Sequence, residues 1–255
     1  MRNVMGLLVI MTLSIAFTSS FLILNAMSAT QEPNKEAGES TVLYVAKWEV
    51  SPNKYDAYMN WTFDETNGAL RRILKIPSLM EFRGYNVSVS AVPYQFVGVS
   101  EFSNLAEWAD WYKKEDIQKL FNELRFYTPN LTFELWGPSP LIPNPIRPGK
   151  TESQEGIRVL NIWRWNIVPE KSEAYSGWAQ SSIPRVLNVP GIIELRGYRP
   201  ICGESQIILT LEFPDLVTWA KWYSHQDIQE LMGELRTYAS GVNTELWSEI
   251  TRAKP

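Results

Sequence analysis

The residues with the clearest potential for chemistry form a short motif that occurs twice. Glu-x-Arg-Gly-Tyr is present at Glu81, Arg83, Gly84 and Tyr85, and again at Glu194, Arg196, Gly197 and Tyr198. Side chains alternate between the two faces of a strand, so the carboxylate, guanidinium and phenol would share one face. They could orient a polar ligand, the guanidinium clamping an anion or enolate, the phenol donating and the carboxylate acting as a base. We favour the alternative, in which glutamate and arginine form a structural ion pair at the junction of two sheets.

Tryptophan is unusually frequent, with eleven residues in a chain of 255. Ten of them recur as pairs between the two halves of the sequence, and Trp163 has no counterpart. Regular placement of this kind is more often core than ligand site, because each ring buries a large area. The functional alternative is an aromatic cavity between sheet and helices for a flat apolar ligand. Its walls would be Trp48 and Trp165, and its lids Trp108 and Trp219.

The remaining reactive residue types exclude several classes of site. Cys202 and His225 are the single cysteine and the single histidine, so an intramolecular disulfide and a zinc site with several Cys or His ligands are impossible. A Ser-His-Asp triad is allowed by the counts, but nothing orders one. Carboxylate-bound metals are still compatible with the composition, but we assign no metal ligand and no catalytic residue. Lys and Arg number 24 against 28 Asp and Glu, so we expect no nucleic-acid partner.

The elements that must position these residues are arranged as a tandem repeat. Without gaps, 45–61 aligns with 162–178, 76–85 with 189–198, and 101–127 with 212–238. Each copy, 41–136 and 157–250, shows the order βαββαβ in its apolar periodicity. Between them, 137–156 carries five prolines and is predicted to be an extended connector outside any sheet. In the second copy, Ser182 before Pro184 is predicted to restart a short helix.

This order predicts an α+β protein of two tandem ferredoxin-like units, packed sheet to sheet as an intramolecular dimeric α/β barrel that forms a pseudo-dimer within one chain. The run Glu-Phe, about five residues, Trp-Ala-x-Trp-Tyr, then Asp-Ile-Gln-x-Leu, begins at Glu101 and again at Glu212. Together with the element order and the proline after strand one, it resembles the antibiotic-biosynthesis-monooxygenase-like (ABM) family of the dimeric α/β-barrel superfamily. That superfamily includes oxygenases, haem-degrading enzymes, isomerases and proteins without known chemistry, so fold alone does not transfer a function.

The resemblance also suggests a test for haem. Haem-degrading relatives place an iron-ligating histidine in the second helical region, where this chain has 117–120 and 228–231, neither with a histidine. A strand-one asparagine of those enzymes is replaced by Trp48 or Trp165. His225 lies earlier, and we interpret it as a solvent-facing residue at a helix junction, with haem ligation as the alternative. We therefore expect no cofactor.

The N-terminus indicates the compartment. Residues 4–29 are apolar behind Arg2, so 1–29 is predicted to be a cleaved signal peptide or a membrane anchor, followed by a flexible spacer at 30–40. Both alternatives place the body in a secreted, periplasmic or extracytoplasmic location, with membrane contact through the N-terminal segment if it is uncleaved.

These observations lead to one function hypothesis and two alternatives. The first is an extracytoplasmic tandem domain that binds a small aromatic or apolar molecule or serves as an accessory module. The second is a cofactor-independent oxygenase acting on an aromatic substrate, with Arg83 or Arg196 stabilising an anionic intermediate. The third is a structural subunit of a membrane-associated complex.

Overall fold

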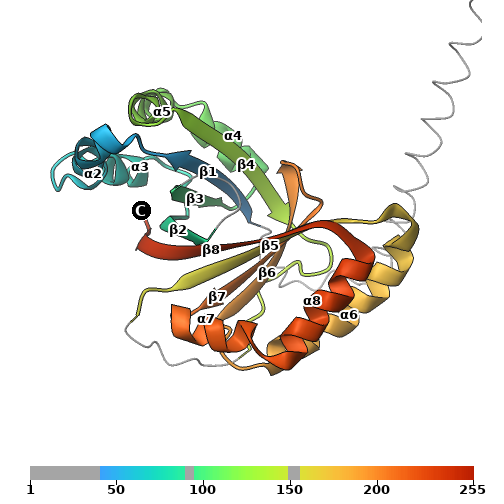
Figure 1. Ribbon diagram of the computed structural model, residues 1–255. Helices are drawn as coiled ribbons and strands as arrows, with labels where there is room; N and C mark the ends of the chain where they lie inside the picture. Colours follow the sequence, from blue (N-terminus) through green and yellow to red (C-terminus); the bar gives the residue numbers. More distant parts are fainter. Residues whose placement is uncertain (1–40, 90–94, 149–155) are drawn as a thin grey trace, which may run out of the picture. The chain divides into compact units, whose positions relative to one another are not determined.

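A computed structural model describes residues 41–89, 95–148 and 156–255 (Figure 1). The predicted targeting segment (1–29) and spacer (30–40) lie outside this part of the chain. Among the described residues, no helix has both the length and the apolar character needed to cross a bilayer.

The two halves of the chain have the same order of elements, except that the first half has two helices where the second has one long helix. The first half contains β1 (Val42–Glu49), η1 (Pro52–Lys54), α2 (Tyr55–Phe63), α3 (Ala69–Leu74), β2 (Glu81–Val89), β3 (Phe96–Phe102), α4 (Leu105–Tyr112), α5 (Glu115–Tyr127) and β4 (Asn130–Pro138). The second half contains β5 (Val159–Ile167), η2 (Pro169–Lys171), α6 (Ser172–Asn188), β6 (Glu194–Cys202), β7 (Ile207–Phe213), α7 (Leu216–Tyr223), α8 (Gln226–Tyr238) and β8 (Ala239–Ala253). Asn104 and Asp215 cap α4 and α7 by accepting from the backbone N–H three residues on.

The strands form one closed antiparallel barrel in the order β1-β3-β2-β8-β5-β7-β6-β4. The expectation of two ferredoxin-like units packed sheet to sheet is therefore wrong. The two halves are joined edge to edge, because β2 pairs with β8 and β4 pairs with β6. An unpaired strand edge leaves a row of backbone donors and acceptors without partners, and closure removes every such edge. Side chains on the inner face of the sheet pack against those of the strands across the barrel interior.

The connector between the halves also differs from expectation, since part of it belongs to the barrel. Pro138, the last residue of β4, pairs with Tyr198. Ser139 N–H donates to the Gly197 carbonyl at 3.0 Å, and Ile146 forms an isolated bridge with Leu195. Proline restricts the chain without preventing this pairing, because the donors come from the residues between the prolines.

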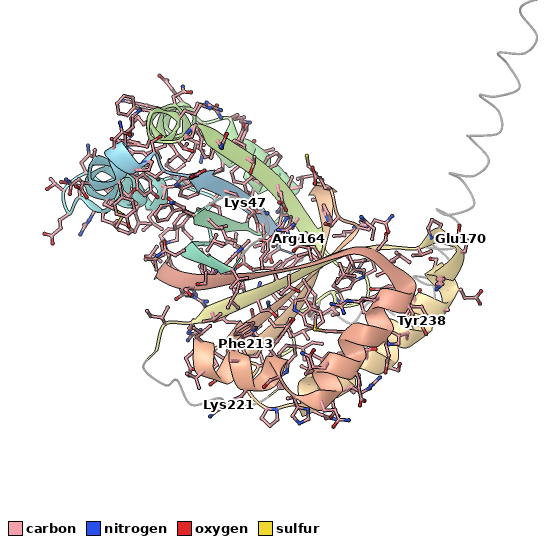
Figure 2. All side chains as sticks on the ribbon, in the orientation of Figure 1. Lys47, Arg164, Glu170, Phe213, Lys221 and Tyr238 are labelled. Atoms are coloured by element: carbon pink, nitrogen blue, oxygen red, sulfur yellow. The ribbon has the colours of Figure 1, made fainter. Side chains whose placement is uncertain are left out.

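One end of the barrel interior holds a cluster of paired charges. Glu134 accepts from Lys47 at 2.5 Å and from Arg164 at 2.7 Å, and Arg164 lies 3.1 Å from Glu245. Figure 2 shows Lys47 and Arg164 near one another where the halves meet. The indole of Trp136 donates to Glu134 at 2.7 Å. Both halves contribute to this cluster, so its charges are satisfied only when the barrel is closed.

A second cluster occupies the other end of the interior. Glu101 lies 2.6 Å from Arg83 and 3.0 Å from Arg196, so one carboxylate joins arginines of both halves. The Glu212 carboxylate forms ion pairs with Arg158 at 2.6 Å and with Arg252 at 2.9 Å. Burial alone would raise the pKa of the Glu101 carboxyl, but the two adjacent guanidiniums outweigh it and hold the pKa below its usual value. Between the two clusters lie stacked rings of Trp136 and Trp247 with centroids 6.3 Å apart, and aliphatic side chains.

The helices lie outside the barrel in two groups. Figure 1 shows α2 to α5 beside β1, β3 and β4, whereas α6 to α8 lie beside β5 to β7. Each group packs on the outer face of its own half, and each has a separate hydrophobic core there. In the part of the chain that the structure describes, apolar side chains therefore gather in the barrel interior and in one layer under each group of helices.

We predict that Glu101→Gln lowers the free energy of unfolding by about 3–5 kcal/mol, because it leaves two buried guanidiniums without their shared carboxylate. Urea unfolding followed by tryptophan fluorescence measures this. Asp110→Asn is the control, since Asp110 pairs with Lys113 in solvent, with both side chains more than half exposed, and its urea midpoint should not move. A midpoint for Glu101→Gln equal to that of the native chain would contradict the role of this carboxylate in closure.

Acid should destabilise the native chain in a defined window. Neighbouring cations overcome burial to lower the pKa of Glu101, Glu134 and Glu194 in the folded state. Such groups stabilise the fold above the unfolded glutamate pKa of about 4.3 and lose this contribution as pH falls through the lower folded value. Urea midpoints should thus be level above about pH 5 and fall steeply below about 4.3. Glu101→Gln should show a shallower fall, and an identical slope would contradict this assignment.

Candidate functional site

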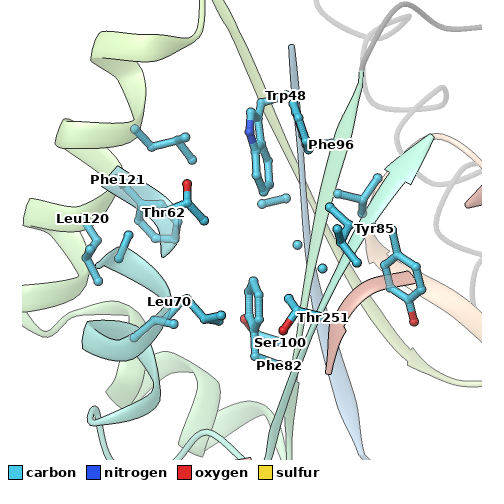
Figure 3. Close-up of a pocket in the computed structure, with 18 of the residues that line it drawn as sticks. Trp48, Thr62, Leu70, Phe82, Tyr85, Phe96, Ser100, Leu120, Phe121 and Thr251 are labelled. Carbon is cyan, nitrogen blue, oxygen red and sulfur yellow. The ribbon is translucent and has the colours of Figure 1, made fainter. Parts of the chain in front are cut away.

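The largest cavity described lies between the outer face of the first-half sheet and helices α2, α3 and α5, and we call it the first cavity. Its free volume is about 100 Å³, measured as the space open to the centre of a water molecule. Alternation along β1 sends Tyr44, Ala46 and Trp48 toward the helices and Leu43, Val45 and Lys47 into the barrel. Figure 3 shows Trp48 and Phe82 at its two ends, with Phe121 on the helical side.

Small residues and a broken helix create this space. Ala46, Gly84 and Gly98 supply sheet positions with little or no side chain. Pro77 follows Trp61 by sixteen positions, whereas Pro190 follows Trp178 by twelve. The additional residues form the turn between α2 and α3, in which Asp64 Oδ1 accepts from the backbone N–H groups of Thr66 and Asn67 at 2.9 and 2.7 Å. The helical wall is therefore interrupted beside the cavity.

Within the turn, Gly68 is required by a close backbone approach. A Cβ built at Gly68 would lie 2.7 Å from the backbone N and O of Asp64. Because backbone atoms cannot move aside as a side chain can, any larger residue would displace the start of α3.

The cavity is aromatic, uncharged and nearly all apolar. Two of the residues that line it are hydrogen-bonded to each other: the indole Nε1 of Trp48 donates to Tyr58 Oη at 3.2 Å. Burial raises the pKa of Tyr58 to about 12 and that of Tyr44 further, so both phenols are neutral at physiological pH. Tyr44 Oη and Trp111 Nε1 are buried without a hydrogen-bond partner among the described residues. The site can therefore enclose a flat apolar molecule and offer it a few neutral donors.

A second cavity occupies the related place in the other half and is smaller, about 70 Å³ by the same measure. Trp163 stands where the first half has Ala46, and its Nε1 donates to Asn161 Oδ1 at 2.6 Å. Ile142 of the connector packs against Gly197, where a Cβ would meet Ile142 Cβ at 2.9 Å. Helix α6 runs unbroken through Pro184, so the prediction that Ser182 restarts a helix is wrong. The Ser182 hydroxyl instead donates to the Trp178 carbonyl at 2.7 Å.

The sequence-predicted tryptophans divide between these cavities and other surroundings. Trp48 lines the first cavity and Trp165 lines the second. Trp108 and Trp219, predicted to be lids, are not among the residues that line either one. They stack instead on Tyr112 and Tyr223, with centroids 5.5 and 5.3 Å apart.

The glutamate, arginine and tyrosine of each Glu-x-Arg-Gly-Tyr motif lie on one face of the strand, and that face is the barrel interior, whereas Gly84 and Gly197 lie on the outer face. Arg83 lies 3.2 Å from Glu81 and 2.6 Å from Glu101. Arg196 forms an ion pair with Glu194, and Glu194 forms a second ion pair with Arg147 at 2.5 Å. Burial raises the pKa of Tyr85 and of Tyr198 to about 12, so both are neutral. Tyr85 also borders the first cavity, although its ring points away from it (Figure 3).

Space beside these arginines is very limited. The interior void that Arg83 and Arg196 border measures about 10 Å³, which is close to the minimum for one water molecule. Their guanidiniums are already engaged by carboxylates, so they have little capacity left for a ligand. The structure brings the motif together as an ion-pair network and separates it from Trp48 and Trp165.

The single histidine lines neither cavity. His225 is the N-cap of α8, where its Nδ1 accepts from Asp227 N–H at 3.3 Å, and its side chain is half exposed. No cluster of three or more potential metal ligands occurs among the described residues. Cys202 is exposed at the end of β6.

Sequence reasoning missed the residues that distinguish the two cavities. Trp163 has no tryptophan counterpart in the first repeat, where the aligned residue is Ala46. This difference in size was the available signal that the two cavities would differ. It also missed Lys47, Glu134, Arg164 and Glu245, although Glu-Leu-Trp closes both copies. A charged residue in a strand with apolar alternation was the available sign of a buried pair.

Comparisons with known proteins reveal fold similarity only. No family model matches the chain, and no curated protein matches it. A solved structure named "Putative monooxygenase" from Fusobacterium nucleatum has a TM-score of 0.64 at 10% identity, covering 84% of this chain and 94% of its own. An anthrone oxidase-like protein gives 0.58 at 8% identity, with 84% and 93% covered. A variant chlorite dismutase from Candidatus Nitrospira defluvii gives 0.57 at 13%, with 84% and 92% covered. The chain is similar in fold to these proteins.

Proposed function

We propose that this chain binds a small, flat, apolar molecule in the first cavity. The observation that carries the proposal is a cavity walled by aromatic rings, next to a barrel whose interior is filled. Trp48, Phe82 and Phe96 provide apolar surface, and residues of both α2 and α3 contribute to the helical wall on either side of the break between them. Ligand sites in proteins are typically concave and apolar with a few polar groups.

The expected affinity is modest. Burying roughly 150 Å² of apolar ligand surface contributes about 4 kcal/mol before the loss of translational and rotational freedom. Apolar cavities of about 150 Å³ accommodate single aromatic rings. The first cavity is smaller, at about 100 Å³, so a ligand with a single ring should bind, with a dissociation constant in the millimolar range or weaker.

The alternative proposal is a cofactor-independent oxygenase that uses the same cavity. The names of two structural neighbours, a monooxygenase and an anthrone oxidase-like protein, favour it at the level of fold. The arginines expected to stabilise an anionic intermediate, Arg83 and Arg196, face the barrel interior in ion pairs. Any acid-base work in the first cavity would have to come from neutral hydroxyls such as those of Tyr58 and Ser100.

We also propose that the body is exported, on the apolar segment 4–29 behind Arg2. Fractionation of the native host with mass spectrometry of the mature N-terminus tests this. Recovery of the intact chain from the cytoplasm would contradict export.

Ala46→Leu should weaken binding of fluorobenzene at least tenfold, because the larger side chain occupies the space the ligand needs. The measurement is ¹⁹F NMR titration. Ala179→Leu is the matched control, since Ala179 lines the second cavity, and it should change the affinity by less than twofold. Equal affinities in all three proteins would place the ligand elsewhere and refute the proposal.

The oxygenase alternative predicts protein-dependent oxygen uptake with a single-ring, electron-rich aromatic compound, hydroquinone. In that reaction hydroquinone and O₂ give 2-hydroxy-1,4-benzoquinone and water, so one oxygen atom enters the product and the other leaves as water. An oxygen electrode should record a rate above the spontaneous one that disappears in Ala46→Leu. A rate equal to the protein-free control would leave binding as the function.

A further inference from the structure

The two cavities differ in the hydrogen bonding of their walls. In the second cavity's half, Trp163 donates to Asn161, Trp165 donates to Tyr175, and Trp222 donates to the Val186 carbonyl at 3.4 Å. In the first cavity's half, Trp48 and Trp61 have acceptors, but Trp111 does not. The repeats align Trp111 with Trp222, so the same indole has an acceptor in one half and none in the other among the described residues.

Trp111 is fully enclosed. Its side chain has 0% exposure, and it forms part of the first cavity's wall. A buried donor without an acceptor costs roughly 1–3 kcal/mol, and buried polar groups are satisfied in the great majority of native proteins. Trp111 Nε1 therefore has a free-energy reason to meet an acceptor that enters the cavity.

Tyr44 adds a second donor to the same wall. Its ring centroid lies 5.9 Å from that of Trp111, with the planes at 64°, and it is 4% exposed. Its hydroxyl has no partner among the described residues. Burial raises the pKa of this phenol, so it remains a donor. The position aligned with Tyr44 in the second half is Asn161, whose amide oxygen and nitrogen are both bonded.

We propose that the first cavity selects a neutral ligand with a hydrogen-bond acceptor on an otherwise apolar frame, that Trp111 and Tyr44 recognise this acceptor, and that the second cavity has no such selectivity. This inference rests on the proposed function and specifies the chemistry of its ligand. The two halves are therefore functionally unequal, with one selective site per chain.

The test uses acetophenone and cumene, which have the same number and connectivity of non-hydrogen atoms, but only acetophenone has a carbonyl oxygen. Titration calorimetry should give a preference for acetophenone that falls about three- to tenfold in Trp111→Phe, the size expected for one net hydrogen bond. Trp222→Phe is the matched control in the second half and should leave the preference unchanged. Tyr44→Phe, a smaller change, should lower it in the same direction.

A readout on the native sequence covers the case in which Trp111→Phe fails to fold. In a ¹⁵N-labelled protein, acetophenone should shift the Trp111 indole N–H resonance downfield and cumene should not. Insensitivity of that resonance to both, with both compounds bound, would mean that its donor is satisfied otherwise and would overturn the inference. Binding of neither compound would instead refute the proposed function, so the two failures are distinguishable.

Discussion

The structure depends on the pairing of each half's outer strands with those of the other half. β2 with β8 and β4 with β6 complete a barrel that neither half could close alone. This closure brings Glu101 between arginines of both halves, and Lys47 and Arg164 onto the same carboxylate. Buried charges without partners are costly, so the ion clusters make the closed arrangement strongly preferred over halves that separate or slip in register.

A filled barrel interior determines where a ligand can be held. The inner face is taken by paired charges, stacked indoles and aliphatic side chains, with a void of about 10 Å³ beside the arginines. The outer face is covered by helices, whose fit to the sheet varies along the chain. In the first half, alanine and glycine on the sheet and the turn between α2 and α3 leave that fit incomplete. A recognition site at this position can vary without disturbing the closure of the barrel, since the two lie on opposite faces of the same strands.

Much of the fold was predictable from sequence, and its assembly was not. Period-two alternation predicted that Glu81, Arg83 and Tyr85 share a face, and they do. It could not show whether this face met another sheet or curved into a barrel, because both arrangements bury the same residues. Pairing between edge strands, as between Gly137 and Arg199, determines which arrangement forms. This pairing involves backbone atoms and therefore leaves little trace in the pattern of side chains. The prediction of sheet-to-sheet packing failed for this reason.

The site was only partly predictable, because alternation along a strand assigns a residue to one face but does not show how well that face is filled. The sequence favoured a core role for the tryptophans, with a cavity as the alternative; Trp48 and Trp165 line cavities, whereas Trp108 and Trp219 line neither. A cavity forms where residues are too small to fill the space around them. Ala46 indicates such a place only when it is compared with Trp163, the residue aligned with it in the second repeat. The most direct measurement of the central claim is a crystal structure of the protein soaked with acetophenone. The account predicts electron density for the ligand between Trp48 and Phe82, and density inside the barrel beside Arg83 and Arg196 would contradict it.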